Sequence, residues 1–196
     1  MKIAIIDYDA GNLRSVANAL DLLQIEYFIA KQANDLEAAD KIILPGVGAA
    51  GSAMQKLISS GFAEAIKQTK KPLLGICLGL QLFADFSEEE NTDCLGIIPE
   101  KVKLFPPFLK TPQMGWNQVN FTNKSPLFEE IPDASYFYFV HSYYLPTSKY
   151  TLAQTDYGIT FSSVVQKDNF YATQFHPEKS GELGLKLLSN FCKLCG

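Results

Sequence analysis

The sequence predicts an α/β protein with an open mixed sheet in three layers, mostly parallel with an antiparallel extension, and helices on both faces. In the first half of the chain, short apolar segments alternate with amphipathic ones, which is typical of a parallel sheet covered on both faces. In the second half, short β-branched and aromatic segments are separated by turn residues, which is typical of antiparallel strands. An amphipathic segment over residues 181–194 closes the chain.

The first half predicts four strands and three helices. The strands are short apolar runs at residues 2–6, 26–30, 41–44 and 72–76. Apolar residues at helical spacing predict helices at 11–24, 53–69 and 78–86. In the first of these, Leu13, Val16, Leu20 and Leu23 share one face.

The second half predicts the antiparallel extension and a last helix. Its strands are expected at residues 101–105, 115–121, 136–140, 151–156, 161–166 and 170–175. The segment 87–93 is predicted to be a charged loop and 105–113 a proline-rich one, and the last helix covers 181–194.

Composition limits the function classes. The chain has 196 residues, 47% of them hydrophobic and 19% charged, which fits a single globular domain over residues 1–196. The net charge is -4 and no Lys/Arg run exists, so neither nucleic acid nor an anionic membrane is expected as a partner. No apolar run approaches the roughly 20 residues of a membrane span. The N-terminal segment resembles a buried strand rather than a signal peptide, so we expect a cytoplasmic protein with reduced cysteines.

Cys77 lies between two glycines where a predicted strand turns into a helix. Gly75 precedes it by two residues and Gly79 follows by two, which is the layout of a nucleophile elbow. The helix N-terminus would stabilise a thiolate there, and the Leu78 amide could bind a developing oxyanion. A buried cysteine that merely fills space fits these five residues equally well.

A nucleophilic cysteine needs a base, and the chain has only two histidines. His176 follows a predicted strand, with Glu178 two residues later and Pro177 fixing the backbone between them. A carboxylate that close can orient the imidazole and stabilise its charged form. His141 has no acid near it in the sequence. We therefore predict Cys77 as nucleophile, His176 as general base and acid, and Glu178 as the group that orients His176.

The segment 46–51 matches the G-x-G-x-x-G pattern of dinucleotide sites. It follows the third strand rather than the first, Pro45 separates it from that strand, and no second strand ends in an acid at the expected distance. We prefer a second interpretation, in which Gly46, Val47 and Gly48 lie beside Cys77 and donate another backbone N–H to the oxyanion. Glycines there would permit a peptide flip.

Cys192 and Cys195 form a C-x-x-C pair at the end of the last helix. Such a pair can be a redox couple or half of a zinc site. No second pair of ligands lies near it in the sequence, so helix packing is expected and no metal site is predicted. No cofactor is expected either.

The segments 44–48, 75–83 and 174–180 together resemble the class I glutamine amidotransferases, over essentially the whole chain. The resemblance implies glutamine hydrolysis by a Cys-His-Glu triad and transfer of the ammonia to a synthase. It implies an oxyanion site at Leu78 and the Gly46–Val47–Gly48 segment. It also implies that Gln81, Ser142 and Tyr143 hold the amino-acid end of the substrate. On spacing alone, Gln81 would equally be a solvated helix residue.

Further segments resemble the glutaminase subunits of imidazole glycerol phosphate synthases, which act in histidine biosynthesis. These segments are 7–16, 44–54, 114–119, 136–144 and 164–181. The resemblance implies a heterodimer with a (β/α)8-barrel cyclase subunit, which makes imidazole glycerol phosphate and AICAR from the ammonia it receives. Asn12, Tyr138 and Lys179 match positions that face the barrel. Glutaminase turnover in this subfamily stays low until the cyclase binds its ligand, and a flip of the 46–48 segment would account for that.

One position departs from the pattern, because Gln113 stands where relatives commonly have a histidine. A glutamine replaces one donor or acceptor of an imidazole but does not titrate.

Three alternatives remain at this point. The chain could serve another synthase, such as an anthranilate, aminodeoxychorismate or sugar-modifying one. It could be a silent adaptor, although the triad residues are intact. It could also be a cysteine peptidase, which would not need residues that hold glutamine.

Overall fold

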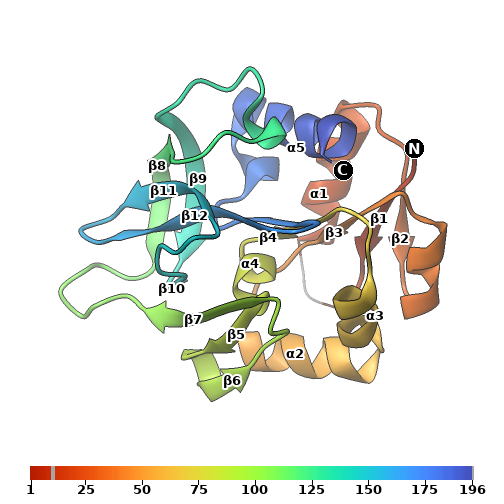
Figure 1. Ribbon diagram of the computed structural model, residues 1–196, viewed down its shortest axis with the longest axis horizontal. Coiled ribbons are helices and arrows are strands. Elements are labelled where there is room, and N and C mark those ends of the chain that lie inside the picture. The colour runs from red at the N-terminus through yellow and green to blue at the C-terminus, as the bar shows by residue number, and fades with distance from the viewer. Residues whose placement is uncertain (10–11, 196) are drawn as a thin grey trace.

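The computed structural model describes residues 1–9 and 12–195 (Figure 1). Its helices are α1 (Leu13–Leu22), α2 (Ala50–Ser59), α3 (Phe62–Gln68), α4 (Leu78–Leu82) and α5 (Gly181–Leu194). Its strands are β1 (Ile3–Ile6), β2 (Tyr27–Ala30), β3 (Lys41–Leu44), β4 (Leu73–Ile76), β5 (Ala84–Ser87), β6 (Thr92–Asp93), β7 (Ile98–Leu104), β8 (Gln113–Phe121), β9 (Ser135–His141), β10 (Tyr143–Tyr144), β11 (Thr151–Asp156), β12 (Thr160–Lys167) and β13 (Phe170–Thr173).

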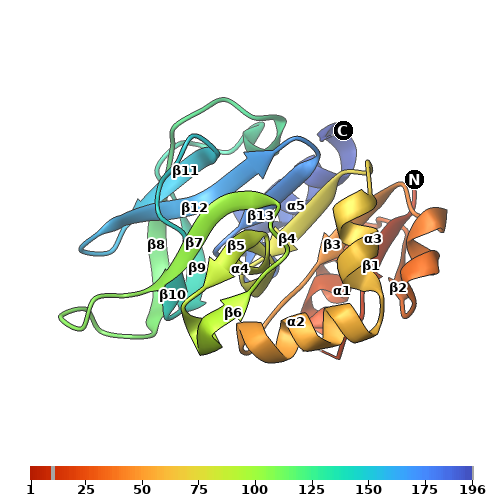
Figure 2. The ribbon, with the colours of Figure 1, turned by 60° about the horizontal axis from the view of Figure 1, so that its bottom comes forward.

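The main sheet is mixed, as predicted. It has nine strands in the order β2-β1-β3-β4-β13-β12-β11-β8-β9. Strands β2, β1, β3, β4 and β13 are parallel, whereas β12, β11, β8 and β9 continue the sheet in antiparallel pairs. The strand predicted at 170–175 was expected within the antiparallel extension. As β13 it instead joins the two parts, because it pairs in parallel with β4 and antiparallel with β12 (Figure 2).

Helices cover both faces of this sheet, which gives the three predicted layers (Figure 1). One apolar core joins the sheet to α1 and α5, through residues such as Val16, Leu20 and Phe191. A second core joins the opposite face to α2, α3 and α4, through residues such as Leu57, Phe62 and Leu80. The strands β1, β3 and β4 are buried along their whole length, as strands covered on both faces must be.

A second, four-stranded sheet was not predicted. Its order is β10-β7-β5-β6, and it lies beside α2 and α4 (Figure 1). The strand expected at 101–105 belongs to this sheet as β7 rather than to the extension of the main one. The charged segment 87–93 is only partly a loop, because it ends in the short strand β6. The proline-rich segment between β7 and β8 contains a cis Thr111–Pro112 peptide bond.

Two predicted helices are interrupted or end early in the structure. The helix expected at 53–69 is two helices, because Gly61 adopts a φ of 78° between α2 and α3 and thereby ends the first helix. The helix expected at 78–86 ends at Leu82, and Ala84–Ser87 pairs with β7 as a strand. The apolar pattern of 78–86 continues through this change, so helical periodicity alone could not locate it.

The C-x-x-C pair packs inside the protein. Cys192 and Cys195 are buried against the main sheet, and Lys41 donates from β3 to the carbonyl oxygens of Phe191 and Cys195. The described part of the chain contains no group of three or more His, Cys, Asp or Glu residues that could hold a metal ion. In residues 1–9 and 12–195, no helix has the length and apolarity that a membrane crossing requires.

The carboxyl ends of the parallel strands meet at one edge of the main sheet. There β3 is followed by the 45–48 segment, β4 by Cys77, and β13 by Gln174 and His176. This edge is where open α/β sheets usually carry their binding sites.

Candidate active site

Cys77 occupies a strained turn between β4 and α4. Its φ is 54° and its ψ is −103°, a conformation that an L-residue adopts at a cost. Its backbone N–H donates to Thr173 O at 2.7 Å. A Cβ at Gly79 would lie 2.5 Å from Leu44 O, and a Cβ at Gly75 would lie 2.8 Å from the Gly79 backbone. Both glycines are therefore required sterically, and the segment has the geometry of a nucleophile elbow.

Gly79→Ala is expected to destabilise the chain by about 1–3 kcal/mol, because the added methyl group must displace a backbone carbonyl rather than a side chain. Urea unfolding measures this difference. Gly51→Ala is the matched control: its Cβ would meet side-chain atoms of Glu90 and Thr92 rather than backbone, the nearest being the end of the flexible Glu90 side chain, and alanine favours the helix α2. Equal effects of the two substitutions would contradict the steric account of the elbow.

His176 and Glu178 form a buried pair beside Cys77. His176 Nδ1 lies 2.8 Å from Glu178 Oε1, and their side chains are 1% and 0% exposed. The 3-10 turn Pro177–Lys179 directs the carboxylate back toward the imidazole. The backbone holds His176 in place, since its N–H donates to Tyr138 O at 2.9 Å and its carbonyl accepts from Ser180 Oγ at 2.6 Å.

The other nitrogen of His176 is available for chemistry. Nε2 is buried and has no hydrogen-bond partner among the described residues. Burial favours the neutral imidazole, but the neighbouring Cys77 sulfur and the Glu178 carboxylate outweigh it and raise the pKa of His176 well above its ordinary value. The arrangement therefore favours an imidazolium that can donate a proton from Nε2.

A cavity of about 360 Å³ opens onto Cys77. Its walls include the elbow, the 47–48 segment and the residues after β9: Val47, Gly48, Cys77, Leu78, Gln81, Glu89, Pro112, Val140, His141, Ser142, Tyr143 and His176. It thus brings together every predicted oxyanion and substrate residue except one. Gly46 lies behind the cavity wall, where a Cβ would approach Leu78 Cβ to 2.8 Å and Tyr8 Oη to 2.9 Å. Tyr8 also donates to Pro45 O at 3.0 Å, which anchors the start of this segment.

Gln81 is buried rather than solvated. It is 4% exposed, and its Nε2 donates to Tyr143 O at 2.9 Å and to Gln174 Oε1 at 3.3 Å. The fold thus excludes the solvated-helix interpretation that spacing alone left open.

Glu89 was not predicted from the sequence. It lines the cavity, and its Oε2 accepts from the Ala50 backbone N–H at 2.8 Å. Burial raises its pKa, although the Ala50 hydrogen bond opposes this. A carboxylate in this position can pair with the ammonium group of an amino acid. Three consecutive glutamates, residues 88–90, occupy this segment, and no sequence signal distinguishes the middle one.

His141 is a neutral group in the cavity wall. Its Nδ1 lies 2.7 Å from Tyr143 O, and because a carbonyl only accepts, Nδ1 must carry the proton. Burial lowers the pKa of His141 to about 4; nearby His176 adds to this and the Tyr143 carbonyl opposes it. Gln113 lies directly opposite His141 in the β8–β9 register, and both side chains are buried. The residue that departs from the family pattern thus lies buried beside a residue of the cavity wall, His141.

The low pKa of His141 predicts acid sensitivity. Between about pH 6.5 and pH 4 the unfolded chain binds this proton and the folded chain does not, so stability falls as the pH falls through that window. We expect His141 alone to lower the free energy of unfolding by about 2 kcal/mol when the pH falls from 7 to 5. Urea unfolding of the wild type and of His141→Gln at both pH values isolates this contribution. An equal loss in both proteins would contradict it.

The three residues predicted to face a partner have different environments. Asn12 donates its side-chain N–H to Glu178 Oε1 and is half-buried, so it contacts the carboxylate of the candidate triad. Tyr138 is half-buried on β9 and its ring meets Trp116 edge-on, with centroids 6.2 Å apart. Lys179 is exposed and forms no ion pair with any residue in the described ranges.

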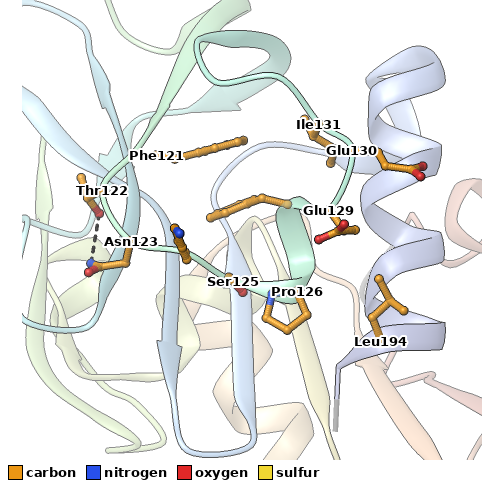
Figure 3. A pocket seen from close by; sticks show the side chains of 11 residues that line it. Phe121, Thr122, Asn123, Ser125, Pro126, Glu129, Glu130, Ile131 and Leu194 are labelled. Carbon is orange, nitrogen blue, oxygen red and sulfur yellow. Dashed lines mark hydrogen bonds between the residues drawn. The ribbon is translucent and has the colours of Figure 1, made fainter.

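A larger cavity lies away from this chemistry. It has a volume of about 870 Å³ and is bounded by the loop after β8 and the end of α5 (Figure 3). Phe121 and Phe128 stack in its wall with centroids 3.9 Å apart. No predicted site residue lines it, so this cavity is separate from the predicted chemistry at Cys77.

Fold and site together define a class of protein. Residues 4–195 match the family model described as glutamine amidotransferase class-I. Among solved structures, one described as a glutamine amidotransferase has a TM-score of 0.78 at 18% identity, covering 99% of this chain and 98% of its own. A glutamine amidotransferase from Thermotoga maritima has a TM-score of 0.68 at 15% identity, covering 98% of this chain and 82% of its own. The two structures share the fold with this chain.

Closer relatives carry one name, imidazole glycerol phosphate synthase subunit HisH. The protein of that name from Bacteroides fragilis (strain YCH46) is 52% identical, over 99% of this chain and 100% of its own length. Those from Bacteroides thetaiotaomicron and Dehalococcoides mccartyi (strain CBDB1) are 49% and 48% identical, over 99% and 98% of this chain and 100% and 97% of their own. The chain belongs to the class I glutamine amidotransferase family and, within it, to the HisH family.

Proposed function

We propose that this chain is the glutaminase subunit of an imidazole glycerol phosphate synthase and hydrolyses L-glutamine to glutamate and ammonia through a thioester on Cys77. The observation that carries the proposal is the convergence of Cys77 with the His176–Glu178 pair at one end of a cavity whose wall is formed by Gln81, Ser142 and Tyr143. HisH relatives of nearly equal length support the place of this reaction in histidine biosynthesis.

The first half of the reaction forms the thioester. The Cys77 thiolate attacks the side-chain carbonyl carbon of glutamine, and the backbone N–H of Leu78 donates to the oxyanion that develops. An amide of the 47–48 segment, which lines the same cavity, supplies the second donor. His176 then gives the proton on Nε2 to the leaving nitrogen, and ammonia departs.

The second half frees glutamate. His176, now neutral, takes a proton from water, and the hydroxide attacks the thioester carbon. The carbon–sulfur bond breaks and the Cys77 thiolate is restored. Glu178 holds Nδ1 throughout, so that Nε2 keeps facing the reacting atoms.

The same cavity holds the amino-acid part of the substrate. Ser142 and Tyr143 line it together with Gln81, and Glu89 offers a carboxylate to the α-ammonium group. A positive charge close to a carboxylate favours its ionised form. This distribution favours a free amino acid over a peptide.

The chain works with a cyclase subunit, which we propose to be a (β/α)8 barrel docked as a heterodimer beside the triad. The outer face of the β8–β9 pair supports this placement. Met114, Trp116 and Tyr136 are exposed there, and Tyr138 completes the patch. Aromatic residues and methionine are enriched in interfaces. Tyr138 O also accepts from the His176 N–H, so docking at this patch reaches the active site directly.

The test is glutamate release from glutamine by the chain alone, with a cyclase subunit, and with that subunit plus its ribonucleotide ligand. We expect release to rise strongly when the cyclase and its ligand are both added. Trp116→Ala is expected to weaken this stimulation at least several-fold, whereas Ile58→Ala, an equally exposed apolar residue on α2, leaves it intact. Full activity without a partner, or none under any condition, would contradict the proposal.

A further inference from the structure

Gln174 is a buried residue of this site to which the mechanism above gives no role. It lies between β13 and His176 and is 0% exposed. Its Nε2 lies 3.8 Å from Cys77 Sγ, and its Oε1 lies 3.3 Å from Gln81 Nε2. A buried carboxamide that reaches the reacting sulfur from the adjacent strand is in a position to affect its ionisation.

The direction of this carboxamide follows from a single carbonyl group. Tyr143 O only accepts, so the Gln81 atom 2.9 Å away must be the N–H₂ group. That group has a second hydrogen, which it donates to Gln174, so the Gln174 atom facing it is the oxygen. The opposite end of Gln174, which faces Cys77, is therefore its N–H₂ group. This chain of contacts fixes the orientation of the carboxamide groups of Gln81 and Gln174.

We propose that Gln174 is a catalytic residue whose carboxamide N–H donates to the Cys77 sulfur and stabilises the thiolate. The chain Tyr143–Gln81–Gln174 holds that donor in place. The inference rests on the proposed role of Cys77 as nucleophile and adds a residue to the same site. An N–H group favours the charged sulfur over the thiol, because a hydrogen bond to an ion is the stronger one.

The other groups around Cys77 do not replace this donor. Val140 O lies 3.9 Å from Sγ and can only accept, so it favours the protonated thiol. The titratable groups facing Cys77 are His176 after β13 and Tyr8 after β1, and His141 and Glu89 line the same cavity. His176 supplies the positive charge near the thiolate. Gln174 is the neutral side-chain donor whose direction the fold fixes.

Alkylation of Cys77 by iodoacetamide across a pH series measures thiolate formation without requiring glutamine or a partner. Because burial raises the pKa of Cys94 and Cys192 to about 12, and that of Cys195 to about 11, these thiols react slowly below those values. Mass spectrometry of the peptides assigns the label to Cys77. Two variants are informative. Gln174→Met keeps the length of the side chain and removes the N–H donor. Gln174→Glu keeps an oxygen that accepts from Gln81 and puts a second carboxylate oxygen in place of the N–H donor.

In both variants we expect the midpoint of alkylation to move up by about one pH unit and the rate at pH 7 to fall about tenfold. Gln166→Met, a substitution of the same type on β12 outside the cavity, is expected to leave the profile unchanged. An unchanged midpoint in either folded Gln174 variant would overturn the inference.

A measurement on the unaltered chain covers the case in which both variants fail to fold. The NMR signals of the Gln174 side-chain N–H₂ group are expected to change position over the same pH range in which alkylation of Cys77 speeds up. In Cys77→Ala this pH-dependent change is expected to be absent. Resonances that do not respond to Cys77 would overturn the inference. A midpoint that depends on Gln174 in a chain that never hydrolyses glutamine would preserve the inference and reject the proposed function.

Discussion

Cys77→Ala is expected to lower glutamine hydrolysis by about 10⁶-fold, because the members of a nucleophile–base unit fail together when one is removed. The alanine lacks the sulfur that forms the thioester, whereas the cavity and the Leu78 amide remain. Glutamine binding is therefore expected to persist while turnover is lost. Glutamate release by the chain with its cyclase subunit measures the turnover, and calorimetric titration with glutamine measures the binding.

Cys94→Ala is the matched control for this variant. Cys94 is also buried, its thiol donates to Thr92 O, and it does not line the cavity that opens onto Cys77. We expect reduced stability with turnover retained in the folded molecules. Comparable losses of turnover in both cysteine variants would mean that stability, not chemistry, explains the effect of Cys77→Ala.

His176→Gln is expected to reduce turnover about as much as Cys77→Ala, and the double variant is expected to be no worse than either single one. Without the imidazole, the leaving nitrogen receives no proton from Nε2 and water is not activated. Glu178 would also keep its carboxylate buried without the imidazolium that balances it. The same glutamate assay checks this prediction.

The chain contains a second histidine, His141, so the loss of turnover in His176→Gln can be compared with the loss in His141→Gln. His141 donates from Nδ1 to Tyr143 O, and its pKa of about 4 keeps it neutral near pH 7. Glutamine at position 141 retains a donor for that carbonyl, so a far smaller loss is expected for His141→Gln. A larger loss from His141→Gln than from His176→Gln would mean that the base is assigned to the wrong histidine.

The parts of this fold that could be predicted are those set by local sequence. The last helix matches its predicted range, and the triad residues lie in short motifs, G-x-C-x-G and His-Pro-Glu, whose geometry depends on neighbouring residues. Where a glycine has a positive φ, as Gly61 does between α2 and α3, helical periodicity gives no warning of the break. The strand β5 was missed because its apolar residues continue the pattern of α4 and its pairing with β7 is a tertiary contact.

The site residues that could not be predicted act through contacts distant in the sequence. Glu89 enters the cavity because Ala50, on α2, donates to its carboxylate. Gln174 reaches Cys77 across the β4–β13 pairing, ninety-seven positions along the chain. Asn12, expected at a partner surface from resemblance, donates to Glu178. Gln174 and Asn12 lie in segments that carry the family resemblance, 174–180 and 7–16, but the spacing of residues within these segments does not indicate either contact.

The most direct test of the central claim is to trap the intermediate. The chain, assembled with its cyclase partner and that partner's ligand, is mixed with glutamine, quenched in acid within its first turnover, and digested for mass spectrometry. The account predicts one glutamyl adduct, on the peptide that carries Cys77, and no adduct in Cys77→Ala. Glutamine turnover with the glutamyl group on another residue, or with no adduct under conditions that preserve thioesters, would contradict it.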